Sequence, residues 1–123
     1  MSLSPVEELL RLSSAQTNLL LEGGESQVET VLTAVAPSLP RPVTTWGGTA
    51  SLPTVRDGTL IVPLVNRFDD DQQRQLLRWL DETAGTVRVI ATTPGSLFRL
   101  VQRGTFLDAL YYRLNTIRVE LVA

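Results

Sequence analysis

Five short apolar runs alternate along this chain with segments whose apolar residues recur at helical spacing. Runs this short suit buried strands, and two parallel strands of one sheet need a crossover long enough to hold a helix. The alternation therefore predicts an α/β fold, with a mainly parallel sheet covered by helices on both faces. The predicted strands are residues 17–22, 42–46, 59–65, 86–93 and 116–122, and the predicted helices are residues 4–14, 25–36, 69–82, 96–102 and 106–114.

Local signals mark the ends of some of these elements. Asp69 and Gln72 have the spacing of a capping box, which predicts a helix start. Pro63 falls late in the third apolar run, where a central strand tolerates proline poorly. Residues 47–57 are rich in Gly, Ser, Thr and Pro, which predicts a loop inside one domain that spans residues 1–123.

The composition restricts the kinds of catalytic and metal chemistry that this chain can perform. All 11 basic residues are Arg, and the chain has no Lys, His or Cys. These absences exclude Schiff bases, His-assisted nucleophiles, the usual zinc sites, disulfides and thiol redox chemistry. A net charge of −2 argues against binding nucleic acid through bulk charge. No apolar run approaches the roughly 20 residues that span a bilayer, so we expect a cytoplasmic protein without membrane contact.

Four stretches of the sequence resemble the AAA+ domain of bacterial enhancer-binding proteins, the ATPases that remodel RNA polymerase carrying sigma-54. They are GTLIV at 58–62, the helix pattern at 73–82, VRVIATT at 87–93, and FxDxLYYRLN at 106–115, which is the most specific. The first strand matches more loosely. The resemblance implies a three-layer core like that of P-loop NTPases, with a five-stranded sheet in the order 5-1-4-3-2.

This chain departs furthest from the family pattern at the phosphate-binding loop. Family members carry GESGTGKE, in which glycines let backbone N–H groups face the phosphates and a Lys reaches them. The matching stretch starts at Gly23 and Gly24, but Val28 takes the place of a required Gly, Glu29 that of the Lys, and Thr30 follows. An anion repels a triphosphate by about 4 kcal/mol per charge pair at about 4 Å and an effective dielectric of about 20. The sequence therefore predicts a degenerate nucleotide pocket and no cofactor.

Other functional positions of the family are also changed. The acidic pair that holds magnesium and polarises water falls on Pro63 and Leu64, and the polar sensor of the terminal phosphate falls on Pro94. Of two Arg residues that act on a neighbouring subunit's nucleotide, the first position is Leu107 and only Arg113 remains. The resemblance therefore implies a degenerate ATPase without catalytic residues.

Residues 47–57 contain no string like the GAFTGA signature that engages sigma-54, and no lid subdomain or DNA-binding helix-turn-helix is expected. The resemblance thus implies a regulatory or protein-interaction module in bacterial transcription or signalling. Its expected partner is an AAA+ relative or a second copy, without direct DNA binding. Three other interpretations stay open: an ATP-binding regulator that does not hydrolyse, a fragment of a two-component response regulator, and a hydrolase with a new carboxylate site.

Four residues are candidates for a partner surface. Tyr111, Tyr112 and Arg113 match the family segment that docks on the neighbouring subunit's cleft, and Trp79 lies off the main apolar stripe of its helix. Arg113 also has a simpler interpretation, in which it neutralises Asp108 or caps carbonyls near the helix end.

Acidic residues offer weaker candidates. Glu22, Glu25 and Glu29 flank the degenerate pocket and could act as an acid/base pair, but solvated surface carboxylates explain them more simply. The three aspartates at 69–71 could bind a hard cation through their oxygens. A helix start favoured by the macrodipole is the simpler interpretation, so we predict no metal site.

Overall fold

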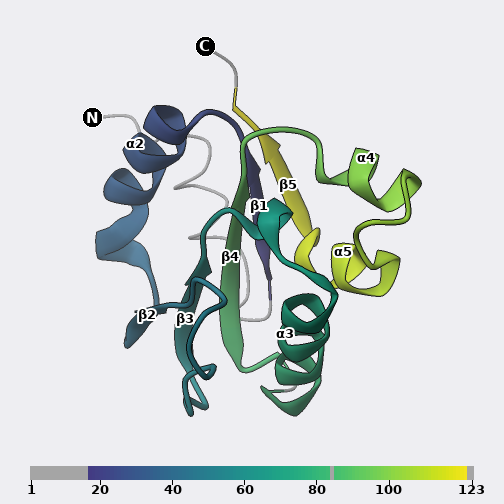
Figure 1. Ribbon diagram of the computed structural model, residues 1–123. Coiled ribbons are helices and arrows are strands. Elements are labelled where there is room, and N and C mark those ends of the chain that lie inside the picture. Colours follow the sequence, from purple (N-terminus) through teal and green to yellow (C-terminus); the bar gives the residue numbers. More distant parts are fainter. Residues whose placement is uncertain (1–16, 84, 122–123) are drawn as a thin grey trace.

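A computed structural model describes residues 17–83 and 85–121 of the chain. Its five strands form one sheet in the order β2-β3-β4-β1-β5, and every neighbouring pair is parallel (Figure 1). This confirms the strand order expected from the resemblance. The strands are β1 Leu19–Glu22, β2 Val43–Thr45, β3 Gly58–Val62, β4 Val87–Thr93 and β5 Ile117–Glu120.

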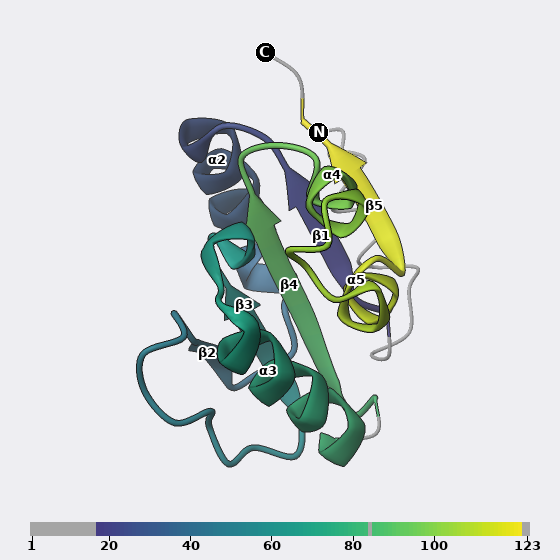
Figure 2. The same cartoon turned by 45° about the vertical axis from the view of Figure 1, so that its right-hand side comes forward.

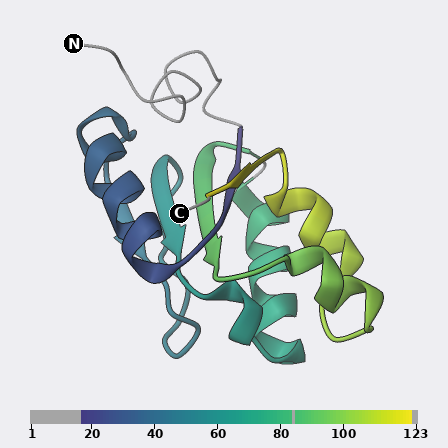
Figure 3. The ribbon, with the colours of Figure 1, turned by 90° about the horizontal axis from the view of Figure 1, so that it is seen from above.

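Helices cover both faces of the sheet, as Figures 2 and 3 show. Helix α2 lies on one face, and α3, α4 and α5 lie together on the other. The α-helices are α2 Glu25–Val35, α3 Asp70–Thr83, α4 Leu97–Gln102 and α5 Asp108–Leu114, with short 3₁₀ turns η1 at Ala36–Ser38 and η2 at Val65–Arg67. The helix predicted at residues 4–14 lies outside the described residues.

Each face of the sheet has its own hydrophobic core, because alternate side chains of a strand point to opposite faces. On the β1 strand, Leu20 joins the core beneath α3, α4 and α5, while Leu19 and Leu21 join the core beneath α2. Val28 and Val35 anchor α2 onto that second core. The structure is therefore a three-layer α/β domain, as the apolar pattern predicts.

The third strand ends earlier than its apolar run predicts. It stops at Val62, because Pro63 has no N–H to donate and Leu64 adopts a left-handed backbone with φ of 53°. The apolar run continues to Val65, which is the first residue of η2 and is buried in the core, although it is not part of the strand. A proline after an apolar strand thus marks the carboxyl end of β3.

The start of α3 follows the capping box predicted for Asp69 and Gln72. The Gln72 backbone N–H donates to Asp69 Oδ1, and the Asp69 N–H donates to Gln72 Oε1, both at 2.9 Å. The next aspartate, Asp70, pairs with Arg74 one turn along at 2.7 Å. The acidic run therefore begins a helix, which is the interpretation the sequence favoured.

One buried amide joins α3 to α5. Gln73 is 2% exposed, and its Oε1 accepts the Leu107 N–H at 2.8 Å. Its Nε2 donates to the carbonyls of Phe68 and Thr105 at 2.9 and 3.0 Å. Because a buried amide is costly without partners, these bonds fix the loop before α5 against α3.

Trp79 is buried, so the prediction that it belongs to a partner surface is wrong. Its side chain is 7% exposed within the core, and its indole N–H donates to the Pro53 carbonyl at 2.9 Å. The helical pattern placed Trp79 off the apolar stripe because that stripe marks only the side of α3 that faces the sheet. The loop at residues 51–56 packs against α3 at Trp79 and buries that side chain.

None of the helices in the described ranges is long and apolar enough to cross a membrane.

Candidate functional site

Three parallel strands end at one edge of the sheet, which is where open α/β sheets usually bind ligands. β1, β4 and β3 are neighbours in the sheet, and their carboxyl ends are Glu22, Thr93 and Val62. The residues that follow them are those assigned to the degenerate pocket, namely Gly23, Gly24, Pro63, Leu64 and Pro94. The fold therefore brings these predicted positions to one edge (Figure 1).

The turn between β1 and α2 is the feature that most limits phosphate binding. Only Gly23 and Gly24 separate Glu22 from the first helical residue, Glu25. A P-loop needs four residues between its two glycines, so that several backbone N–H groups can surround a phosphate ahead of the helix. This turn is too short to form that cradle.

The two glycine N–H groups are already bonded within the chain. The Gly23 N–H donates to the Thr93 carbonyl at 2.9 Å, and the Gly24 N–H donates to Gln27 Oε1 at 3.1 Å. A Cβ on Gly23 would lie 2.6 Å from the Cβ of Leu121, which follows β5. Glycine is thus required here by close packing against Leu121 and not by an open phosphate cradle.

The other three residues assigned to that loop lie inside α2. Val28 is 9% exposed and packs into the core beneath the helix. Glu29 is exposed, and the Thr30 hydroxyl donates to the Ser26 carbonyl of the preceding turn at 2.9 Å. The residue-by-residue match assumed a loop of the family's length, but in this chain the helix starts directly after the glycines.

Glu22 is the one acidic group at this edge that is buried, among the described residues. It is 4% exposed, Oε2 accepts the Leu97 N–H at 3.1 Å, and Oε1 accepts from the Arg118 guanidinium at 2.7 Å. This bond, together with the negative charge of Glu22, raises the pKa of Arg118. For Glu22 the interpretation as a solvated surface carboxylate is wrong, although Glu25 and Glu29 are exposed as that interpretation requires.

Sequence reasoning missed Arg118 because its partner lies 96 residues away in the chain. A signal was present, since Glu22 directly follows three apolar residues of a buried strand. A carboxylate is rarely buried unless it is paired, so a basic residue on a neighbouring strand was to be expected.

The ends of β3 and β4 offer hydroxyl groups that the fold itself uses. The Leu64 N–H donates to Thr92 Oγ1 at 3.0 Å, and the Thr93 hydroxyl donates to the Gly95 carbonyl at 3.1 Å. Pro63, Leu64 and Pro94 bring no carboxylate or amide side chain. Across residues 17–83 and 85–121, no three acidic, His or Cys side chains gather closely enough to hold a metal ion.

The predicted partner segment on α5 is only partly exposed. Tyr112 is 66% exposed, whereas Tyr111 is 6% exposed, so the prediction of a surface role for Tyr111 is wrong. Burial, with a smaller contribution from Glu22, raises the pKa of Tyr111. Tyr111 belongs to the core beneath α3, α4 and α5, and its ring also contacts Phe98 of α4, with the ring centroids 5.6 Å apart.

Arg113 forms an ion pair with Asp81 of α3, and not with Asp108, which the simpler interpretation offered as one of two partners. Asp108 instead accepts the N–H of the next residue at the start of α5. Phe98 is 41% exposed beside this segment and was not predicted, because a single exposed aromatic residue in a short helix gives no periodic signal. Phe98 and Tyr112 are hereafter called the α4–α5 aromatic surface.

The all-parallel sheet in this strand order, with helices on both faces and a glycine turn after the first strand, defines an α/β domain of the P-loop NTPase type. A sequence model of the family described as the sigma-54 interaction domain matches residues 17–123. The chain therefore belongs to the sigma-54 interaction domain family, an AAA+ core.

Curated relatives are transcriptional regulators by name. The HTH-type transcriptional regulatory protein TyrR of Enterobacter agglomerans is 35% identical over 75 residues, which cover 52% of this chain and 14% of TyrR. TyrR of Salmonella typhimurium is 34% identical over 77 residues, covering 52% of this chain and 15% of that protein. The chain therefore matches only a small part of the length of these relatives.

Solved structures show the same fold. NtrX from Brucella abortus in complex with ADP superposes with a TM-score of 0.71 at 20% identity, over 94% of this chain and 34% of that chain. The P-loop NTPase domain of a sigma-54 transport activator from E. coli gives a TM-score of 0.64 at 14% identity, over 96% of this chain and 92% of that chain. At these identities the similarity shows the fold alone.

Proposed function

We propose that this domain is a non-catalytic relative of the sigma-54 activator ATPase core, which regulates bacterial transcription or signalling through protein contacts. The observation that carries the proposal is the two-residue turn between β1 and α2. A nucleotide held in the usual pose needs a longer loop of free N–H groups, and here both glycine N–H groups are bonded within the chain.

The charges at the carboxyl edge support the same proposal. The family's Lys is absent, since all basic residues are Arg, and Arg118 at this edge is paired with Glu22. Pro63, Leu64 and Pro94 cannot hold magnesium or orient a water for attack. The role in transcription is supported by the family and by the names of the TyrR relatives.

Calorimetry with nucleotide tests the proposal directly. We expect no heat of binding when ATP with magnesium, or ADP, is titrated into the protein at 25 °C, and no release of phosphate. A thermal shift at millimolar nucleotide gives a second readout, because a ligand at about 100 times its Kd stabilises a fold by about 2.7 kcal/mol. An intact sigma-54 activator ATPase domain serves as the positive control.

Micromolar affinity for ATP or ADP in this experiment would overturn the proposal. If phosphate were not released, that result would establish the open alternative of an ATP-binding regulator without hydrolysis. Phosphate release above the buffer rate would establish an enzyme.

The α4–α5 aromatic surface is the proposed contact with an AAA+ relative or a second copy. Phe98 and Tyr112 are 41% and 66% exposed, and aromatic residues are enriched among binding hot spots. Arg113 is a weaker anchor, because its guanidinium is already paired with Asp81.

Sedimentation experiments test this contact. The protein is run alone, and then with a purified AAA+ activator ATPase domain from the same organism. We expect a heavier species in one of the two runs, and the double variant F98A/Y112A is expected to lose it. Arg103→Ala is the matched control, because Arg103 is exposed on the turn after α4 and outside this surface. A single light species in both runs would overturn the contact.

A further inference from the structure

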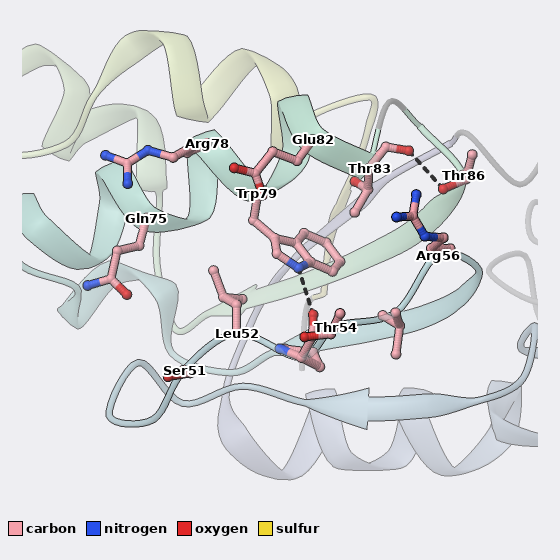
Figure 4. A pocket seen from close by; sticks show the side chains of 12 residues that line it. Ser51, Leu52, Thr54, Arg56, Gln75, Arg78, Trp79, Glu82, Thr83 and Thr86 are labelled. Atoms are coloured by element: carbon pink, nitrogen blue, oxygen red, sulfur yellow. Dashed lines mark hydrogen bonds between the residues drawn. The ribbon is translucent and has the colours of Figure 1, made fainter.

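A groove opens between the loop at residues 51–56 and helix α3, on a different set of elements from the α4–α5 aromatic surface (Figure 4). Its volume is about 630 Å³. Trp79 stands across its middle and is held there by the bond from its indole N–H to the Pro53 carbonyl. Leu52 and Val55 add apolar surface from the loop side.

The groove is open to solvent along its length. Arg56, Gln75, Arg78 and Thr86 line it from both sides, and all four are exposed. Sites for small molecules usually enclose most of the ligand surface. An open groove along a helix better suits a chain that lies along it, as in peptide recognition.

The loop wall offers unused backbone groups to such a chain. Thr54, Val55 and Arg56 lie outside any helix or strand, and no hydrogen bond between described residues uses their backbone N–H or carbonyl groups. A bound peptide in extended conformation pairs with groups of this kind when it adds alongside an exposed segment. The backbone of the loop can therefore supply affinity that does not depend on the peptide's sequence.

The charges of the groove favour an acidic partner, although the whole chain carries a net charge of −2. Arg56 and Arg78 both line it, and neither guanidinium forms an ion pair or hydrogen bond with a described residue. Glu82 is the one acidic side chain in the lining. Figure 4 shows Arg78 and Arg56 on opposite sides of Trp79. Two carboxylates that flank an apolar residue would match this arrangement.

The length of the groove sets the size of the bound segment. Between Gln75 and Thr83, which both line it, α3 rises by about 12 Å at about 1.5 Å per residue. An extended chain advances about 3.3 Å per residue, so this length holds roughly four residues.

We propose that this groove binds an acidic, extended peptide segment of a partner protein. An apolar side chain of the peptide packs against Leu52 and Val55 beside the buried ring of Trp79. Carboxylates on either side pair with Arg56 and Arg78, and the peptide backbone pairs with the loop at residues 54–56. This proposal rests on the protein-interaction role proposed above and gives that role a second, chemically defined site.

Selection from a phage-displayed library of random octapeptides tests the proposal on the full chain. We expect enriched peptides to carry two acidic residues around an apolar one. The most enriched sequence is then synthesised with a fluorescent label, and its Kd is measured by anisotropy.

Charge reversal at the groove is the decisive comparison. Arg56→Glu and Arg78→Glu are each expected to weaken binding of that peptide about tenfold or more, because attraction becomes repulsion. Arg103→Glu makes the same change of charge at an exposed position away from the groove, and it is expected to change the Kd less than about twofold. Equal losses in all three variants, or no loss in any, would overturn the proposal, as would enrichment of peptides without acidic residues.

The two tryptophan side chains locate the binding site. In a ¹⁵N spectrum the indole N–H peak of Trp79 is expected to move on addition of the peptide, more than that of Trp46, which donates to the Ala50 carbonyl outside the lining. The same spectrum shows whether each variant is folded. A larger shift at Trp46 would overturn the assigned site.

Two further results separate this proposal from the others. Glutarate that moves the Trp79 peak when no peptide does would replace the peptide by a small dicarboxylate and overturn the proposal. Nucleotide binding by calorimetry overturns the non-catalytic function and leaves a measured peptide site intact. Absence of peptide binding, with no nucleotide binding either, overturns the groove alone.

Discussion

Replacing Glu22 with alanine is expected to destabilise the domain by about 2–4 kcal/mol. The carboxylate accepts the N–H of Leu97, the first residue of α4, and so performs from strand β1 the capping that the Ser96 side chain does not provide. Leu97 is fully buried, so its N–H would lose its acceptor at a cost of about 1–3 kcal/mol. The space left by a side chain that is 5% exposed adds to this cost.

Urea unfolding and thermal melting measure this loss. For a chain of 123 residues, about 1 kcal/mol lowers the Tm by roughly 3–5 °C, so Glu22→Ala is expected to melt roughly 10 °C lower. Glu22→Gln is the matched control, because its amide oxygen still accepts the Leu97 N–H in a side chain of the same size. The loss in free energy of unfolding for Glu22→Gln is expected to be less than half of the loss for Glu22→Ala.

Two results would refute the reasoning about Glu22. A free energy of unfolding for Glu22→Ala within about 0.5 kcal/mol of the natural protein would show that the carboxylate is not a structural acceptor, since surface substitutions fall in that range. Equal losses for Ala and Gln would show that the charge facing Arg118, and not the cap on α4, makes the difference.

Three other predictions follow from the packing. Burial raises the pKa of Tyr111 above 10.0, so the stability of the fold is expected to fall as pH rises above about 10. The variant Tyr112→Phe keeps Tyr111 as its one tyrosine, so an absorbance titration of that variant measures this pKa, and a midpoint at or below 10.0 would contradict the prediction. Gly58 has φ of 97° and a Cβ there would clash with the Pro42 carbonyl oxygen, so Gly58→Ala is expected to lower the free energy of unfolding in urea by more than about 2 kcal/mol. Gly95 faces open space, so Gly95→Ala is expected to lower it by less than about 0.5 kcal/mol, and equal midpoints for the two variants would contradict this. Trp79→Phe removes the indole donor to the loop and is expected to cost about 1–2 kcal/mol by the same assay, and an unchanged midpoint would show that the bond contributes nothing.

Much of the fold could be predicted because the signals are local. The β-branched run at residues 87–93 is a fully buried strand, and the capping box of Asp69 and Gln72 is present with both of its bonds. Alternation of strand and helix then leaves few topologies, since crossovers between parallel strands are right-handed. The strand order itself came from the family resemblance and not from these local signals.

The errors lie where burial depends on a distant segment. Trp79 looked exposed because helical periodicity cannot report a loop that packs on the flank of the helix. Glu22 looked solvated because its partners, Leu97 and Arg118, belong to elements far along the chain. Both errors concern irregular or long-range contacts, for which a periodic pattern carries no information.

The stretch aligned with the P-loop shows a different limit of prediction from sequence, because matching residues one by one presumes equal loop lengths. Val28 and Glu29 align with the Gly and Lys of a P-loop, yet both belong to α2, and Val28 packs into the core. The substitutions Val28→Gly and Glu29→Lys would therefore place a glycine inside a helix and a cation on its exposed side, without adding one N–H group ahead of the helix. A phosphate cradle would require a longer turn between Glu22 and Glu25. Substitutions at the aligned positions are therefore expected not to create a phosphate cradle, because they leave the turn between Glu22 and Glu25 at its present length.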